Sequence, residues 1–556
     1  MPRMPPVPAP RSGRRRRVIQ ATVALGLAVA PLAAGLPPAR GAELLEVRID
    51  TLQIPIPLDQ LDGWSRGSAD TARSGNDLAP WLGLLDGRSR SDLQRILRTP
   101  LLKDRSFGRQ LLDTWAGGQL LSEVGNLLTT PDGRSTTGQL QITLRRLLER
   151  GQDVTVLDLL EAIPSRRLNL QLDGLLSLGQ RWRLQLERQR LAMVRLRGLP
   201  LPRLPSAAAA PSGLVPSEPH RTLAPQRLRL AVPGRAEGVP LEIWLPEEAP
   251  RTAQPWLLMM PGLGGNADQL AWLATALSQR GWPVVVLQHP GSDAQALKAS
   301  LSGQRPPPGA ETIAARLADL EAVVAAQRQG RLPVRGNGLV IAGHSLGGLT
   351  ALLAAGVAPF PGLEARCRTA LERLPLHNPS RLIQCQLPER ALPRAPAPPA
   401  DLRGLILFNG FGSLLWPEPG LATLPVPLLM VGGSLDLVTP PLDEQLPLFL
   451  GVRNPRSRLV VVNGGSHFSP VRVAERDEAL LRLGRELVGV DPVRVQGLLL
   501  ALTEAFLRSL EPATGPAPAR TGAGEGPLPP QRLQRQGVMA FVMDPEAARR
   551  WRSELW

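Results

Sequence analysis

The sequence predicts an α/β fold, with a mostly parallel eight-stranded sheet covered by helices on both faces and a small all-α domain in front of it. Three observations predict this arrangement. Short apolar runs alternate with helical patterns in residues 223–490, leucines recur at three- and four-residue spacing in residues 43–190, and residues 191–222 are a linker by composition. At 556 residues, the chain is long enough for two domains and their connections.

The first 42 residues predict an export signal. Residues 14–17 are all arginine, residues 18–34 are mostly apolar, and residues 39–41 form a small-x-small cleavage site. We therefore expect an exported protein, periplasmic or extracellular, whose mature chain begins near Ala42. An uncleaved anchor is the alternative, and the arginines leave open whether the Sec or the twin-arginine route is used.

Residues 43–190 show the leucine spacing of several short amphipathic helices. Leu140, Leu144 and Leu148 are one example, and turn signals such as Asp86-Gly87 separate the helical stretches. The segment contains neither histidine nor cysteine. We therefore expect a small helical domain without a metal site.

Eight short apolar runs follow the linker, the later ones separated by helical patterns. Such runs are typical of strands that are buried on both faces of a parallel sheet. The predicted strands are residues 227–232, 241–245, 256–260, 283–288, 339–342, 404–408, 427–431 and 458–462.

The fifth predicted strand leads into Gly343-His344-Ser345-Leu346-Gly347, which is followed by a helix-forming stretch at residues 349–355. A serine in so sharp a strand-to-helix turn leaves no room for a Cβ two residues to either side, which explains the two flanking glycines. This is the nucleophile-elbow pattern G-x-S-x-G, and it resembles that of the α/β-hydrolase superfamily. We predict Ser345 as the nucleophile.

A serine hydroxyl needs a base to take its proton and a carboxylate to orient that base. In α/β-hydrolases the chain order is Ser, then Asp or Glu, then His, and only His377 and His467 follow Ser345. His467 lies in a glycine-bearing loop directly after the last predicted strand, whereas no predicted strand positions His377. We therefore predict His467 as the base and Asp436, in the loop after the preceding strand, as its orienting acid.

Two rival positions for the acid fit less well. The loop one strand earlier, residues 409–413, contains no carboxylate. Asp443 and Glu444 fall in the next helical pattern, and we interpret them as the solvated first turn of that helix.

The oxyanion of the tetrahedral intermediate needs backbone N–H donors that already point at it. One predicted donor is Leu346, the residue after the nucleophile. The second is Leu263, since the glycine-rich turn within residues 259–266 resembles the H-G-x-G loop of lipases and acetylhydrolases. Pro261 stands where histidine is usual, so a side chain that often buttresses this loop is missing.

Two further segments carry a resemblance. Residues 288–293 resemble the corresponding loop of platelet-activating-factor acetylhydrolases and dienelactone-hydrolase-like proteins. We expect His289, in this loop, to have a structural role. Residues 42–178, notably 120–125 and 158–164, resemble a helical domain of unknown function that precedes α/β-hydrolase domains in cyanobacterial proteins. If the source is cyanobacterial, the thylakoid lumen is a further destination for the exported chain.

Residues 356–402 interrupt the predicted α/β domain after the elbow helix. By resemblance to the superfamily, such an insertion lies over the active-site mouth as a cap. It contains the two cysteines of the chain, Cys367 and Cys385. Because the leader predicts an oxidising compartment, we expect them to form a disulfide.

The C-terminal part, residues 491–556, predicts an amphipathic helix at residues 491–510. A Pro- and Gly-rich linker is expected at residues 511–530 and a short helical tail at residues 533–556.

The formal net charge of +16 invites a nucleic-acid interpretation. However, Lys103 and Lys298 are the only lysines, and arginine is scattered without a basic stripe interleaved with aromatic residues. We expect no nucleic-acid partner, no cofactor and no metal. The expected partner is the substrate, a small-molecule or lipid ester, and a membrane surface is a second candidate. The sequence does not predict the oligomeric state.

These patterns predict an exported serine hydrolase that cleaves carboxylic esters, of acyl or lipid type, through an acyl-enzyme. An amidase or peptidase would use the same triad. A different class is a non-catalytic α/β-hydrolase-like protein that acts as a binding or structural module of the envelope, with the helical domain as its working part.

Overall fold

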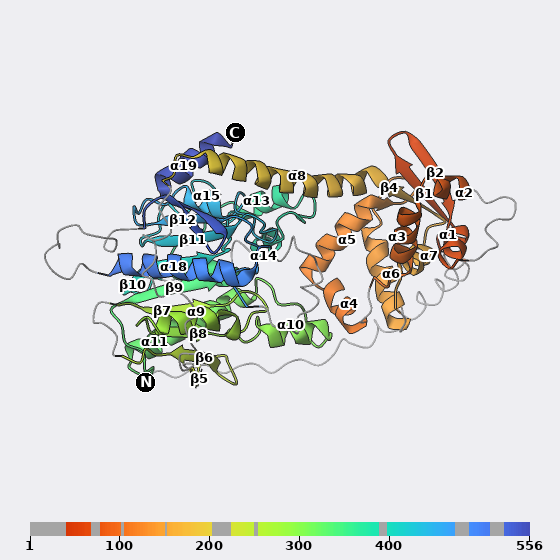
Figure 1. The fold of residues 1–556 in the computed structure, drawn as a ribbon. Helices are drawn as coiled ribbons and strands as arrows, with labels where there is room; N and C mark the ends of the chain where they lie inside the picture. Colours follow the sequence, from red (N-terminus) through yellow and green to blue (C-terminus); the bar gives the residue numbers. More distant parts are fainter. Residues whose placement is uncertain are drawn as a thin grey trace, which may run out of the picture.

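The computed structural model consists of a large sheet domain and a smaller N-terminal domain, connected by the long helix α8 (Leu172–Gly198) (Figure 1). Residues 1–40 of the predicted export signal, residues 1–42, lie outside the described residues. The structure describes residues 41–67, 78–101, 105–150, 153–202, 224–248, 254–387, 397–472, 489–511 and 528–555.

A ten-stranded sheet forms the centre of the large domain, in the order β13-β14-β12-β11-β10-β9-β7-β8-β6-β5. The strands from β8 to β12 along this order are parallel to one another. At the two edges, β6 pairs antiparallel with β8 and β5 with β6, while β14 pairs antiparallel with β12 and β13 with β14. All eight predicted strands are present, as β5 (Gln226–Leu230), β6 (Val239–Trp244), β7 (Trp256–Met260), β8 (Val284–Leu287), β9 (Leu339–His344), β10 (Leu402–Phe408), β11 (Leu428–Gly433) and β12 (Arg458–Val462).

The central strands are buried along their whole length because helices cover both faces of the sheet. On one face, α11 (Thr312–Arg328) and α12 (Leu346–Ala354) pack on residues of one core cluster. On the other, α9 (Asp268–Ser278) and α18 (Pro492–Leu510) pack on a second cluster. This mostly parallel sheet with two covered faces is the α/β-hydrolase fold, as predicted.

The predicted helical tail is wrong over its first half. β13 (Gln531–Arg535) and β14 (Val538–Met543) form a hairpin that adds to the sheet beside β12, and only α19 (Pro545–Glu554) is helical. Gln536 and Gly537 between them have positive φ angles, 48° and 79°, as a tight hairpin turn requires. The sheet domain therefore continues well beyond residue 490.

The N-terminal domain is not all-α. It contains a four-stranded sheet, in the order β2-β1-β4-β3, beside its helices. The turn at Asp50, with φ of 51°, joins β1 to β2, and β4 returns from the end of the domain to pair parallel with β1. These elements are β1 (Leu44–Ile49), β2 (Leu52–Pro57), β3 (Leu128–Thr129), β4 (Arg167–Gln171), α1 (Leu58–Ser65), α2 (Ala79–Gly83), α3 (Gly87–Arg98), α4 (Arg105–Leu112), α5 (Trp115–Leu127), α6 (Thr137–Arg150) and α7 (Val156–Ala162).

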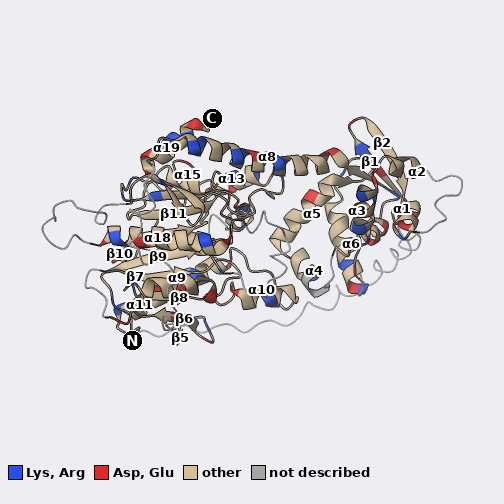
Figure 2. Ribbon diagram, in the orientation of Figure 1, with Lys and Arg blue, Asp and Glu red and all other residues tan. Residues whose placement is uncertain are grey.

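Helix α8 continues through residues 191–198, which the sequence placed in the linker. Its C-terminal half buries Ala192, Met193 and Leu196 in the core of the sheet domain, and the carbonyl of Ala192 accepts a hydrogen bond from Trp551 Nε1 at 3.1 Å. Arginines outnumber acidic residues along the helix (Figure 2). In the ranges that the structure describes, no helix is long and apolar enough to cross a membrane.

Candidate active site

Ser345 occupies a strained turn between β9 and α12. Its φ of 52° and ψ of −116° lie where non-glycine residues are rare. A Cβ on Gly343 would lie 2.3 Å from the backbone of Gly347, and one on Gly347 would lie 2.3 Å from the carbonyl oxygen of Met260. Both glycines of the elbow pattern are therefore required by close backbone approach.

Asp436 and His467 meet in the loops after β11 and β12. Nδ1 of His467 lies 3.0 Å from Oδ2 of Asp436, and both side chains are buried. The carboxylate also accepts hydrogen bonds from Thr439, through its hydroxyl at 2.6 Å and its N–H at 2.8 Å, and from the N–H of Val438 at 2.8 Å. Burial alone would raise the pKa of Asp436, but His467 and the Thr439 donors hold it below its ordinary value. The carboxylate therefore stays ionised beside the imidazole.

Asn409 supports this pair and was missed by the sequence reasoning. It lies in the loop after β10, which was set aside because it contains no carboxylate. Its Nδ2 donates to Oδ2 of Asp436, and its backbone has a positive φ of 51°. A conformation of this kind in a non-glycine residue is a signal of a functional site that only a structure reveals.

His344 connects the turn at Ser345 to the loop that contains His467. Its Nε2 lies 2.9 Å from the backbone oxygen of His467, so this nitrogen carries the proton and donates. The two imidazole rings have centroids 4.9 Å apart. Burial, with His467 nearby, lowers the pKa of His344 to about 3, so the ring is neutral at physiological pH.

The loop of the predicted oxyanion donors lies directly against the elbow. A Cβ on Gly262 would be 3.2 Å from the Cβ of Ser345, so glycine permits this approach. Gly264 has a φ of 73° and donates its N–H to Ser292 O at 2.7 Å. This hydrogen bond ties the loop to the neighbouring loop after β8. Among the backbone hydrogen bonds of the described residues, none uses the N–H of Leu263 or of Leu346. Both donors therefore remain available to a bound group.

Arg316, on α11, replaces the missing histidine buttress of this loop. Its side chain is fully buried, and Nη2 donates to the carbonyl oxygen of Pro261 at 2.6 Å. Nη1 donates to Ser292 Oγ at 2.8 Å and Nε to Thr350 Oγ1, on α12, at 3.1 Å. Burial and, to a smaller extent, Arg235 lower the pKa of Arg316 to about 9, although Asp319 opposes them. From sequence alone this arginine was indistinguishable from a solvated helix residue.

A buried ion pair between Asp319 and Arg235 holds the loop after β8, which contains His289. Asp319 accepts two hydrogen bonds from Arg235, at 2.9 and 2.6 Å, and lies 3.0 Å from Nδ1 of His289. Burial, then Arg316, lowers the pKa of His289 to about 3. His289 is thus a neutral residue of the interior.

The prediction that Glu444 is a solvated helix residue is wrong, because the insertion surrounds it. Its carboxylate is completely buried and accepts hydrogen bonds from Ser380 at 3.2 Å and Gln384 at 3.1 Å on α14 (Ser380–Gln386). Asn378 also donates to it, as do the N–H groups of Gly412 and Ser413. Asp443 likewise binds Gln185 and Arg188 of α8. Both acids therefore connect this part of the sheet domain to neighbouring elements.

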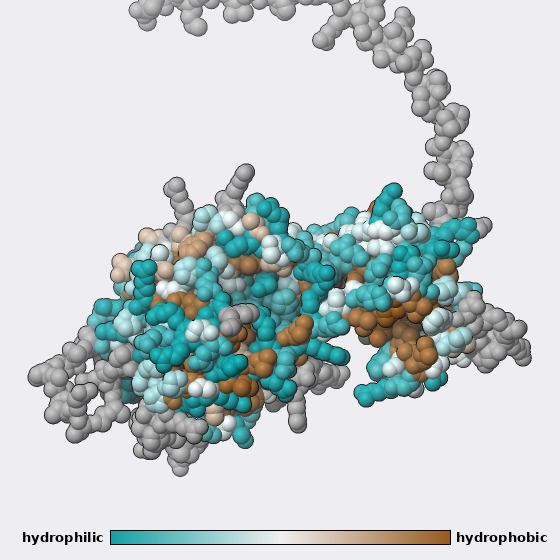
Figure 3. All heavy atoms as spheres, turned by 90° about the horizontal axis from the view of Figure 1, so that it is seen from above, coloured by the Kyte–Doolittle hydropathy of each residue, from teal (hydrophilic) through white to brown (hydrophobic). Residues whose placement is uncertain are grey.

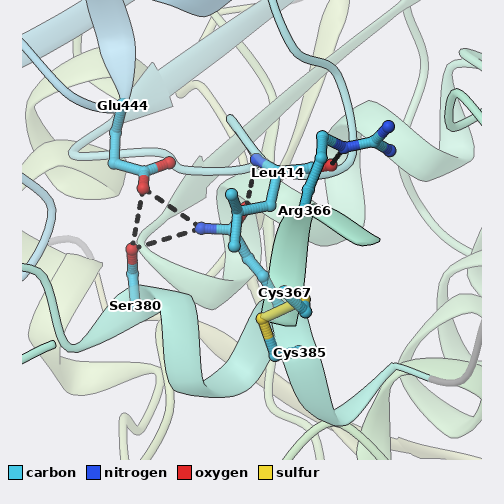
Figure 4. Close-up of a disulfide and its surroundings, with 7 residues drawn as sticks. Arg366, Cys367, Ser380, Cys385, Leu414 and Glu444 are labelled. Atoms are coloured by element: carbon cyan, nitrogen blue, oxygen red, sulfur yellow. Dashed lines mark hydrogen bonds between the residues drawn. A yellow bond between two sulfur atoms is a disulfide. The ribbon is translucent and has the colours of Figure 1, made fainter. Parts of the chain in front are cut away.

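The predicted disulfide is present. Cys367 on α13 (Leu363–Ala370) and Cys385 on α14 are joined, beside the hydrogen bonds of Ser380 to Glu444 (Figure 4). The insertion also contacts the loop that contains Asp436, because the N–H of Ser380 donates to the carbonyl of Val438 at 3.3 Å.

Two family models match the chain. Residues 41–171 match a family described as alpha/beta hydrolase of unknown function (DUF1400), and residues 257–483 match one described as alpha/beta hydrolase family. No curated protein matches the chain. The second match includes Ser345, Asp436 and His467. The chain is therefore similar to α/β-hydrolases over these two ranges, and this similarity indicates a hydrolase.

Proposed function

We propose that the protein is an exported serine hydrolase that cleaves carboxylic esters of acyl or lipid type. The observation that carries the proposal is the strained Ser345 at the end of β9, combined with the buried Asp436–His467 pair at the ends of β11 and β12. The carboxyl ends of parallel strands meet at one edge of a sheet, where this class of fold gathers its catalytic groups.

In the proposed reaction, Ser345 Oγ attacks the ester carbonyl carbon while Nε2 of His467 takes the hydroxyl proton. Asp436 keeps the Nδ1 proton of His467 in place and stabilises the imidazolium. The N–H groups of Leu263 and Leu346 stabilise the oxyanion. Collapse of the intermediate expels the alcohol, which receives its proton from His467. Water then attacks the acyl-enzyme, gives a proton to His467, and releases the acid and Ser345.

Two observations support the ester and export parts of the proposal. The loop from Gly262 to Gly265 resembles the oxyanion loop of lipases and acetylhydrolases, whose substrates are esters. The Cys367–Cys385 disulfide is a bond typical of oxidising compartments outside the cytoplasm. The predicted leader of residues 1–42 agrees with it.

Labelling with a fluorophosphonate probe tests the nucleophile. We expect the mature protein to be labelled and to hydrolyse p-nitrophenyl acetate, and Ser345→Ala to lose both. Ser553→Ala, an exposed serine on α19, is the matched control and should keep both. Labelling that persists in Ser345→Ala, or an unlabelled and inactive wild type, would contradict the proposal.

A further inference from the structure

A pocket of about 1180 Å³ lies between the two domains. One wall comes from the start of α5, with Trp115 and Gln119. The opposite wall comes from the N-terminal turn of α11 and from the two helices that the disulfide joins. Cys367 and Cys385 themselves line it.

The N-terminal domain touches the sheet domain on both sides of this wall. Gln110, on α4, donates to the carbonyl of Gly303, just after α10 (Ala294–Leu301), at 3.4 Å. Glu123, on α5, accepts a hydrogen bond from the N–H of Leu374, just after α13, at 3.2 Å. Trp115 lies between these two anchors in the sequence, on the stretch that faces the pocket.

The pocket lies close to the predicted oxyanion loop. Ile313, in its lining, precedes Arg316 by three residues on α11, and one helical turn rises only about 5.4 Å. Arg316 in turn binds the carbonyl of Pro261, next to Gly262 and Ser345. The pocket and the predicted oxyanion loop are therefore supported by consecutive turns of α11, with the length of the Arg316 side chain between the helix and the loop.

The lining is apolar with balanced charges. Trp115 is 40% exposed, and hydrophobic side chains gather on this domain's surface (Figure 3). Asp113 is paired with Arg145. The remaining charged lining residues are two arginines and two glutamates, Arg305, Arg368, Glu311 and Glu364. Balanced charges give no preference for an anion or a cation, and the volume exceeds that of most small-ligand sites, about 300–1,000 Å³.

We propose that this pocket binds the apolar acyl chain of the ester and that the N-terminal domain, through Trp115, forms part of the substrate site. The proposal rests on the proposed function, because it assumes an acyl substrate at Ser345. It gives the N-terminal domain a role in chain-length selection, with no part in the bond-breaking steps.

The test compares kcat/KM for p-nitrophenyl acetate and p-nitrophenyl dodecanoate. In Trp115→Ala, contact with about two methylenes is lost, so the dodecanoate value should fall about tenfold while the acetate value stays unchanged. Trp115→Phe should recover most of the loss. Ile142→Ala is the matched control, since Ile142 is 61% exposed on α6 of the same domain and outside the pocket.

Leu371→Ala, on the opposite wall, provides an independent variant and should show the same selective loss. Equal losses for both esters in the two variants, or no loss in either, would overturn the proposal. If the wild type hydrolyses neither ester, the proposed function has failed, and binding of 11-(dansylamino)undecanoic acid decides about the pocket. Weaker binding in Trp115→Ala than in Ile142→Ala supports the pocket, and equal binding overturns it.

Discussion

Arg316 donates from Nη2 to the carbonyl oxygen of Pro261 at 2.6 Å, and so holds the peptide that precedes the predicted oxyanion loop. The same guanidinium binds Thr350 on the helix that follows Ser345. One buried side chain therefore sets the loop and the elbow helix in a fixed relation. Preorganised donors of this kind lower a barrier because they do not reorient during the reaction.

We predict that Arg316→Met lowers kcat for p-nitrophenyl acetate while changing KM little, because the loop loses its position and the substrate loses no direct contact. The loss of one oxyanion donor costs about 100- to 1,000-fold, so a displaced loop should cost about 10- to 100-fold. Arg316→Lys should recover part of kcat, since an ammonium group still donates to Pro261. Unchanged kcat in a variant with a lower Tm would assign Arg316 a purely structural role.

The histidines His289 and His344 predict a loss of stability in acid. Burial lowers the pKa of both from 6.5 to about 3. Between these values the unfolded chain binds protons that the folded chain does not, so the free energy of unfolding falls as pH decreases from about 6.5 towards 3. Asp436 adds to this only below its ordinary pKa of 3.8, as pH falls through its lowered folded value.

Urea unfolding at pH 7 and pH 5 measures this slope. We expect His289→Asn to reduce it by about 1 kcal/mol per pH unit, because one coupled proton is removed. His289 is chosen because it lies outside the proposed triad. The same slope in variant and wild type would show that His289 is not neutral in the fold.

Glu444 predicts a large effect of a nearly isosteric change. Both carboxylate oxygens of Glu444 accept hydrogen bonds from N–H or O–H groups. In Glu444→Gln, an NH₂ group takes the place of one of these oxygens. The NH₂ group then faces other buried donors without an acceptor between them. We expect the free energy of unfolding to fall by about 2–3 kcal/mol. Glu372→Gln, an exposed acid in the same insertion, is the control and should change it by less than about 0.5 kcal/mol. Equal urea midpoints for the two variants would contradict the structural role of Glu444.

Residues that the sequence identified have short-range signals. Ser345, Asp436 and His467 each follow an apolar strand at a glycine-containing turn, and their chain order is that of one superfamily. Their supports have no such signal, because each depends on a distant partner. Arg316 lies 55 residues from Pro261, and Asn409 lies 27 residues from Asp436. Burial of these polar groups is a property of the whole fold, so no local pattern in the sequence indicates it.

The missed strands have the same cause. β4 pairs with β1 across more than a hundred residues of sequence, and β14 pairs with β12 across more than seventy. Their local patterns are short, and β3 contains only two residues. Only the Gln536-Gly537 turn gave a local indication of a hairpin. Pairing, more than local preference, made these segments strands.

The last prediction concerns the Cys367–Cys385 disulfide, which lines the interdomain pocket. Closing a loop of 18 residues removes unfolded-chain entropy worth about 3 kcal/mol on the chain-entropy model. The central sheet contains neither cysteine, and Glu444 still holds α14 when the disulfide is absent. We therefore expect the double variant Cys367→Ser/Cys385→Ser to retain its fold and its activity on p-nitrophenyl acetate, but to lose discrimination between short and long acyl chains. Alkylation of two free thiols in protein from its native compartment, or an unchanged chain-length profile in the double variant, would contradict this role of the disulfide.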